Sequence, residues 1–122
     1  METLREQVAA FNGLISQGET ILAMERFYSE QVEMQENEEP PRCGKTRCIN
    51  HERTNLDKVS NFQIQILNQA IDEKNGMVFT EMEIGFKPLQ GQPMKLREVS
   101  VQRWINGQVV QEKFYYKTMM TA

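Results

Sequence analysis

A glutamate and the only histidine of the sequence are neighbours, and they are the side chains best suited to proton transfer. Glu52 falls on the apolar stripe of a segment with helical spacing, where burial would raise its pKa into a range useful for acid–base catalysis. Histidine is the side chain that commonly exchanges protons near neutral pH, which makes His51 a second candidate. Structural roles remain open for both. Glu52 could reach solvent or pair with Arg97 or Arg103, and the histidine could be a surface residue without a role.

Two cysteines precede this pair and raise the question of a metal site. Cys43 and Cys48 together with His51 would supply three zinc ligands, but a fourth is missing and the Cys-x4-Cys spacing matches known zinc motifs only loosely. In a reducing compartment two such thiols are more often free than bridged. We therefore expect free thiols, no metal and no cofactor.

The overall composition excludes several classes of partner. The chain carries 14 basic and 17 acidic side chains, a net charge of −3, and no basic stripe of the kind that nucleic acids require. No apolar run approaches the ~20 residues that span a bilayer, and the N-terminus lacks the features of a signal peptide. We expect a cytoplasmic protein with no nucleic-acid or membrane partner, folded as a single domain over residues 1–122.

Hydrophobic periodicity divides the chain into helices followed by strands. Helical spacing and a capping box formed by Thr3 and Glu6 predict a first helix that ends near Gly18. Two more helices are predicted over 21–28 and 45–59, with a short strand over 32–37 and a proline-containing loop between them. Long strands are predicted over 62–72, 77–87, 95–105 and 108–118, separated by turn residues. The order predicts an α+β fold in which helices cover one face of a curved sheet.

The sequence resembles the SnoaL-like domains of the nuclear transport factor 2 superfamily, which share a cone-shaped fold with ketosteroid isomerase. The residues that carry the resemblance are Phe27-Tyr28, Val32-Glu33-Met34, Gly44 and the segment Val-Ser-Val-Gln-Arg-Trp-Ile-Asn-Gly-Gln-Val at 99–109. The resemblance implies a curved antiparallel sheet packed on three N-terminal helices, a cystatin-like α+β barrel, with a pocket inside the cone. It also implies a homodimer formed through the outer sheet face, and relatives that include isomerases, polyketide cyclases, dehydratases and non-catalytic carriers.

The catalytic groups of the steroid isomerases do not occur at the matching positions. The oxyanion-hole tyrosine aligns near Phe11, the general base near Met34, and the second oxyanion acid near Ser100. A thioether cannot accept a proton at neutral pH, so this comparison excludes the steroid isomerase mechanism. Glu52 aligns with a pocket tyrosine of the isomerases.

The composition of the pocket wall depends on which face each strand turns inward. We assign one alternating set of residues to a common face, Glu81, Glu83, Glu98, Ser100, Gln102 and Glu112, and the set Met82, Ile84, Val99 and Val101 to the other. A two-residue turn at Asn106-Gly107 would pair Ile105 with Gln108 and place Val99 beside Phe114. A three-residue turn with a bulge would pair Trp104 with Gln108 and place Ser100 beside Glu112. The resemblance favours the second arrangement, with a wall formed by Ser100, Gln102, Glu112, Phe114 and Tyr116.

Two functions follow from these observations. The first is binding of a small molecule, with isomerase, cyclase or dehydratase activity on a hydrophobic or polyketide-like metabolite, in which Glu52 and either His51 or Glu112 move protons. The ligand would contact Tyr28, Met34, Ser100, Gln102, Trp104, Phe114 and Tyr116. The alternative is a non-catalytic binding or dimerisation module.

Overall fold

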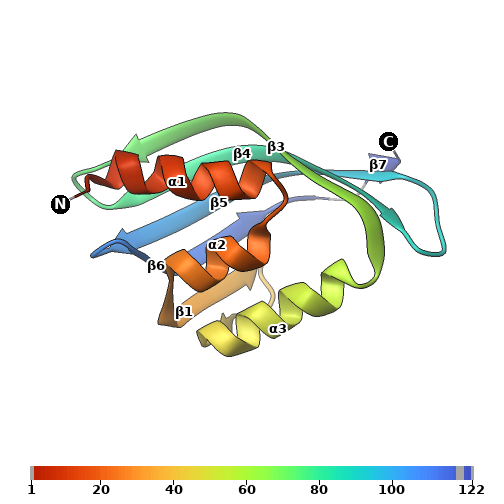
Figure 1. The fold of residues 1–122 in the computed structure, drawn as a ribbon, viewed down its shortest axis with the longest axis horizontal. Helices are drawn as coiled ribbons and strands as arrows, with labels where there is room; N and C mark the ends of the chain where they lie inside the picture. The colour runs from red at the N-terminus through yellow and green to blue at the C-terminus, as the bar shows by residue number, and fades with distance from the viewer. Residues whose placement is uncertain (1, 118–119, 122) are drawn as a thin grey trace.

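The computed structural model describes residues 2–117, 120 and 121 of the chain. Three helices lie on one side of a strongly curved sheet (Figure 1). The helices are α1 (Leu4–Ser16), α2 (Thr20–Phe27) and α3 (Lys45–Leu56). The strands are β1 (Tyr28–Glu36), β2 (Arg42–Cys43), β3 (Val59–Asp72), β4 (Met77–Pro88), β5 (Met94–Ile105), β6 (Gln108–Tyr115) and β7 (Met120–Thr121).

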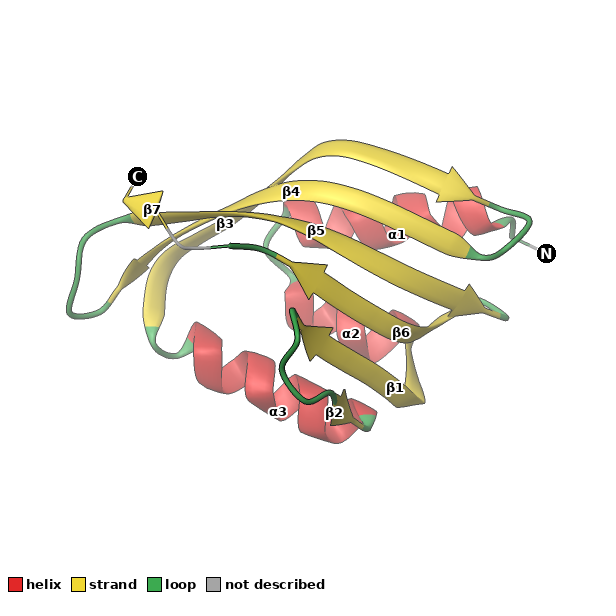
Figure 2. Ribbon diagram, turned by 180° about the vertical axis from the view of Figure 1, so that it is seen from behind, coloured by secondary structure: helices red, strands yellow, loops and turns green. Residues whose placement is uncertain are grey.

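The sheet has the strand order β2-β1-β6-β5-β4-β3, with β7 paired to β5. The pair β1–β6 is parallel and the other pairs are antiparallel, so the sheet is mixed rather than purely antiparallel. Figure 2 shows the outer face of the sheet in front of α1 and α2, with α3 beside the edge formed by β1 and β2. The predicted α+β class and the curved sheet on three helices are confirmed.

Element boundaries differ from the prediction where two periodicities overlap. Helix α2 ends at Phe27 and Tyr28 already begins β1, although both aromatic residues fit the helical spacing. Helix α3 ends at Leu56, and Val59 begins β3 three residues before the predicted start. Val59 is one turn from Leu56 and also continues the alternation of β3, so the pattern alone could not decide between them. The last predicted strand ends at 115, and its predicted end at 118 lies outside the described residues.

Helix α1 begins with the predicted capping box, in which the Thr3 hydroxyl accepts from the Glu6 amide and the Glu6 carboxylate accepts from the Thr3 amide. Its buried side chains pack with α2 against the sheet around an aromatic cluster. The Phe11 ring stacks on Tyr28 at 6.2 Å and meets the Trp104 ring edge-on at 5.8 Å between centroids. This packing fixes the helices over the concave side of the sheet. No helix in the described part of the chain is long and apolar enough to cross a membrane.

The β5–β6 hairpin follows neither of the two predicted registers. Asn106 and Gly107 both have positive φ, 51° and 78°, which makes a two-residue turn, and Ile105 pairs with Gln108. A bulge then follows, because Trp104 pairs with Val109 whereas Arg103 pairs with Gln111. The three-residue turn that we favoured is therefore wrong. Beyond the bulge the register is shifted by one residue, so neither Val99 with Phe114 nor Ser100 with Glu112 is a directly opposite pair.

The shifted register sets the partners of the wall residues. Gln102 lies opposite Glu112, and Ser100 lies opposite Phe114. Side chains directly opposite each other in an antiparallel pair point to the same face. Beyond the bulge, the even-numbered residues of both strands therefore share the concave face, as the favoured arrangement required, although their direct partners differ.

Candidate functional site

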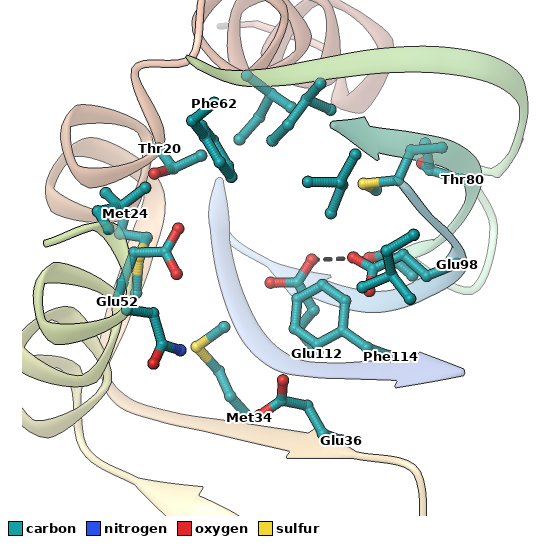
Figure 3. A pocket seen from close by; sticks show the side chains of 18 of the residues that line it. Thr20, Met24, Met34, Glu36, Glu52, Phe62, Thr80, Glu98, Glu112 and Phe114 are labelled. Carbon is teal, nitrogen blue, oxygen red and sulfur yellow. Dashed lines mark hydrogen bonds between the residues drawn. The ribbon is translucent and has the colours of Figure 1, made fainter. Parts of the chain in front are cut away.

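A cavity of about 410 Å³ lies between the helices and the concave face of the sheet. Figure 3 shows the side chains that meet in it, with polar groups on two opposite sides. Most of the lining is apolar and comes from all three helices and from β1, β3, β4, β5 and β6. The apolar lining includes Met24, Met34, Phe62, Ile64, Ile66, Met82, Ile84, Phe86, Leu96 and Phe114. A lining of this kind with a few polar groups is typical of small-molecule sites.

Glu112 is the most strongly held polar group of the cavity. It is 3% exposed and accepts hydrogen bonds from the Tyr28 hydroxyl, from Ser100 Oγ at 2.7 Å and from Gln102 Nε2 at 2.8 Å. Burial raises the pKa of Glu112, and the three donors act against that rise. The carboxyl group is therefore fixed in orientation and able to exchange a proton nearer to neutral pH than an ordinary glutamate.

Glu98 lies on the same wall, two residues before Ser100 on β5, and is 6% exposed. Burial raises its pKa to about 8, and the charge of Glu112 adds to the rise. At neutral pH Glu98 is therefore mostly protonated and can donate a proton. The wall thus carries two carboxyl groups in different surroundings. The pKa of Glu112 is held down by three hydrogen-bond donors, which Glu98 lacks.

A chain of hydrogen bonds fixes the donors around Glu112. Trp104 Nε1 donates to Gln102 Oε1 at 2.9 Å, which turns the amide nitrogen of Gln102 toward Glu112. Tyr28 is buried, and its burial followed by the charge of Glu112 holds its pKa well above the ordinary value. The phenol therefore stays a hydrogen-bond donor at neutral pH.

A second polar group belongs to the helices and faces this wall across the cavity (Figure 3). Glu52 of α3 lines the cavity, and burial raises its pKa. Thr20, at the start of α2, is 6% exposed and also lines the cavity. The Thr20 hydroxyl acts against the rise in the pKa of Glu52, so the two groups are close. Even so, Thr20 Oγ1 is buried and makes no geometrically formed hydrogen bond in the described part of the chain.

A third polar group joins α3 to the end of β1. Arg42 Nη1 lies 2.9 Å from Glu36 Oε2, and Tyr116 donates to Glu36 Oε1 at 3.3 Å. His51 Nε2 lies 3.9 Å from Glu36 Oε2, and its side chain is 40% exposed. All four residues line the cavity. The His51 side chain is thus more exposed than Glu98 or Glu112.

Comparisons with known proteins identify the architecture. Neither a protein-family model nor a curated protein matches the sequence. Solved structures do match. A Mesorhizobium loti protein whose proposed assignment is a SnoaL-like polyketide cyclase is 19% identical, with 94% of this chain and 100% of that chain covered and a TM-score of 0.81. An NTF2-like protein from Burkholderia thailandensis is 15% identical over 96% and 92% of the two chains, with a TM-score of 0.81. This chain has the SnoaL-like, NTF2-like fold.

A third matching structure belongs to a protein with a described role. The epoxide hydrolase/cyclase-like enzyme SalBIII, which acts in pyran ring formation in the polyether salinomycin, is 13% identical. The alignment covers 98% of this chain and 95% of that one, with a TM-score of 0.81. At this identity the match defines the fold and carries no residue assignment.

Within the NTF2-like cone, most residues singled out from the sequence lie around the one cavity described above. The residues predicted for the site that line it are Tyr28, Met34, His51, Glu52, Ser100, Gln102, Glu112, Phe114 and Tyr116. Trp104 does not. It is 4% exposed in the aromatic core beside Phe11, and only its Nε1 acts on the site, through Gln102.

The predicted grouping of the strand acids is wrong for β4. Met82 pairs with Glu98 and faces the cavity, so Glu81 and Glu83 point to the outer face. There Glu83 accepts a 2.7 Å hydrogen bond from Arg97, which is thereby not the partner of Glu52. The prediction assumed that the glutamates of β4 and of β5 point to the same face of the sheet. Which residues share a face is decided by the register between the two strands.

Several residues of the site were not predicted. Glu98 was assigned to the same strand face as Ser100 and Gln102, with which it alternates in step along β5, but it was not included in the predicted site. Thr20, Glu36 and Arg42 carry no comparable signal, since they reach the cavity only through the packing of α2, β1 and β2. Cys43 and Cys48 are free thiols, as predicted, and the described residues contain no group of three or more His, Cys, Asp or Glu arranged to hold a metal ion.

Proposed function

We propose that this protein is an acid–base enzyme that isomerises, cyclises or dehydrates a hydrophobic or polyketide-like molecule bound in the cavity. The observation that carries the proposal is the pair of carboxyl groups on the sheet wall. Glu98 keeps its proton at neutral pH, and Glu112 is oriented by three donors, inside a largely apolar cavity. Such an environment strengthens proton transfer by fixed groups.

The hydrogen bonds of Glu112 leave one of its oxygens available to a substrate. Oε2 accepts from both Ser100 and Gln102, whereas Oε1 accepts only from Tyr28. A carboxylate oxygen has two acceptor positions, so Oε1 retains one. In the proposed reaction Glu112 removes a proton through this position while Glu98 protonates an oxygen of the substrate. Glu52 and His51 are further candidates for proton transfer from the opposite side.

Each reaction class named above needs this combination. Ring closure by attack of a hydroxyl on an epoxide requires a base at the hydroxyl and an acid at the opening oxygen. Dehydration requires a base at carbon and an acid at the departing hydroxyl, and isomerisation requires proton removal and return. The role of SalBIII in pyran ring formation supports the proposal by showing that the same fold accommodates ring-forming chemistry in that protein.

A panel of three probes on a bicyclic apolar ring tests the proposal: a hydroxy-epoxide, a β-hydroxyketone and a β,γ-unsaturated ketone. Turnover of each is followed by proton NMR with the wild type, Glu98→Gln and Glu112→Gln. We expect one probe to be converted and both variants to lose about 100-fold or more. Glu81→Gln is the matched control, because Glu81 is a β4 glutamate of the outer face bonded to Asn68. Conversion that is undiminished in Glu98→Gln would contradict the proposed acid.

A non-catalytic association function is the second candidate, and the outer sheet face favours it. Phe79, Val99 and Tyr115 are 42%, 37% and 45% exposed there. Val99 lies opposite Tyr115, and Phe79 lies opposite Val101 in the next row, so the apolar side chains form one patch. We propose that two copies of the chain pair through this patch. Sedimentation of the wild type as a dimer and of Phe79→Lys as a folded monomer is expected. A monomeric wild type at micromolar concentration would contradict the pairing.

A further inference from the structure

Two buried polar atoms in the described residues lack a hydrogen-bond partner, and both belong to residues that line the cavity. They are Oγ1 of Thr20 and Nε of Arg42. Leaving a buried polar atom unpaired destabilises a protein, and the great majority of such atoms are paired. Thr20 belongs to α2 and Arg42 to β2. The unpaired Thr20 atom indicates that a polar group of a ligand completes the cavity on the side of the helices.

Thr20 defines this position most closely. The residue is 6% exposed, so its hydroxyl is screened from bulk solvent, and the side chain stands at the start of α2 next to Glu52 of α3. A hydroxyl can donate one hydrogen bond and accept others, whereas the apolar neighbours Met24 and Phe62 offer it none. The Glu52 carboxyl group is close enough for the hydroxyl to lower its pKa, but the two do not form a hydrogen bond of ordinary geometry. The threonine therefore marks a place where an oxygen atom is recognised.

Glu52 determines what kind of oxygen fits. Its carboxyl group lines the same side of the cavity and lies across from Glu98 and Glu112 (Figure 3). A carboxylate or phosphate of a ligand would be repelled whenever Glu52 is charged. A ligand hydroxyl can accept from Thr20 and donate to Glu52 at the same time. An alcohol is thus the group that satisfies both side chains without burying a second negative charge.

We propose that the ligand carries two oxygen functions on an apolar body: a hydroxyl bound between Thr20 and Glu52, and the reacting oxygen at Glu98 and Glu112 on the opposite wall. The inference rests on the proposed function for the second contact and on the unpaired Thr20 hydroxyl for the first. It specifies a hydroxylated apolar substrate, such as a hydroxyketone, in preference to an unsubstituted one.

Matched ligands test the recognition of the hydroxyl. The probes are a decalone, which is a bicyclic ketone, and a set of decalones with a hydroxyl at different positions of the distal ring. Binding is measured by isothermal titration calorimetry. We expect the best hydroxydecalone to bind about three- to tenfold more tightly than the decalone, as one added hydrogen bond allows. Equal affinity for the decalone and every hydroxydecalone would overturn the inference, and so would failure of both kinds to bind at millimolar concentration.

Variants assign the preference to Thr20. Thr20→Val keeps the shape and removes the hydroxyl, so the preference should vanish while affinity for the plain decalone is unchanged. Thr20→Ser keeps the hydroxyl and should retain the preference. The matched control is Thr80→Val, since Thr80 is also 6% exposed and lines the cavity, but its Oγ1 accepts from Gln69 at 2.8 Å. A preference that survives Thr20→Val, or that Thr80→Val removes equally, would overturn the assignment.

The outcomes separate this inference from the proposed function. If Glu98→Gln abolishes turnover but no hydroxydecalone is preferred, the acid–base function stands and the hydroxyl site is wrong. If the preference depends on Thr20 but no probe is converted, the hydroxyl site stands as a binding site and the proposed reaction is wrong.

Discussion

The hydroxyl of Ser100 donates a 2.7 Å hydrogen bond to Glu112, although the residue directly opposite Ser100 in the ladder is Phe114. The contact is diagonal. Gln102, which does lie opposite Glu112, donates to the same oxygen at 2.8 Å. Diagonal neighbours on one face of an antiparallel pair are within reach of each other. Two successive inward positions of β5 therefore hold one carboxyl group of β6.

The protonated state of Glu98 makes stability depend on pH. Its pKa in the folded chain is about 8, above the ordinary 4.5, so between these values the unfolded chain has released a proton that the folded chain keeps. The free energy of unfolding therefore falls as pH rises through this window and levels off above it. In the wild type, Glu98 should lower the free energy of unfolding by on the order of a few kcal/mol across this window. We expect this contribution to be absent in Glu98→Gln, as measured by urea unfolding at several pH values.

The control for this measurement is Glu81→Gln on the outer face. Glu112 and Glu52 also have raised pKa values and contribute slopes of the same sign, so Glu98→Gln should flatten the curve only in part. Parallel curves for the wild type and Glu98→Gln would show that Glu98 is ionised in the folded protein.

Tyr28→Phe should alter the pH dependence of catalysis. The Tyr28 hydroxyl lowers the pKa of Glu112 by donating to its carboxylate, so its removal raises that pKa. If Glu112 is the base, the acidic limb of the kcat/KM profile moves to higher pH, while the alkaline limb set by Glu98 stays near pH 8. Tyr115→Phe, at an exposed outer position, is the control. An unmoved acidic limb in Tyr28→Phe would argue that another group is the base.

Substitution of two equally buried threonines should have opposite effects on stability in the absence of ligand. Thr20→Val removes an unpaired buried hydroxyl and should raise the free energy of unfolding by about 1 kcal/mol. Thr80→Val removes the acceptor of Gln69 and should lower it by a similar amount. Thermal and urea unfolding of both variants checks the signs. A loss of stability in Thr20→Val would mean that its hydroxyl is already satisfied.

Two glycine substitutions test how closely β5 is held. Gly76 has φ of 68°, and a Cβ there would lie 2.5 Å from the backbone oxygen of Trp104, so Gly76→Ala should destabilise the fold by about 2 kcal/mol or more. Gly13 on α1 has open space around it, and Gly13→Ala should stabilise the helix by about 0.5–1 kcal/mol. Urea unfolding measures both. Equal effects of the two alanines would refute the close contact at Gly76.

Hydrophobic period and turn residues were sufficient to predict the fold class, whereas the side of β5 that faces the cavity was chosen from the resemblance to the SnoaL-like domains. Ser100 and Gln102 alternate with outward residues, and this periodicity depends only on strand geometry. Alternation within one strand does not show which residues of β4 share a face with Ser100 and Gln102. That depends on the register in which β4 pairs with β5. Glu81 was therefore misplaced although its own strand was predicted correctly.

The other features that the sequence did not predict come from packing between distant segments. Thr20 and Glu52 are adjacent only because α2 and α3 lie beside each other over the sheet. Nothing in the sequence of either helix indicates that it contacts the other. The opposite holds for Trp104. Its position near the wall residues in sequence suggested a ligand contact, but an indole at that point fits the aromatic core with Phe11 and Phe27.

The extra residue in β6 decides the charge of the cavity. Counted by simple alternation from Val109, which is buried, the inward positions of β6 would be Gln111 and Lys113. The bulge resets the parity, so Glu112 and Phe114 face inward instead. The same strand sequence could thus present either a basic or an acidic wall, and a single inserted amino acid selects the acidic one.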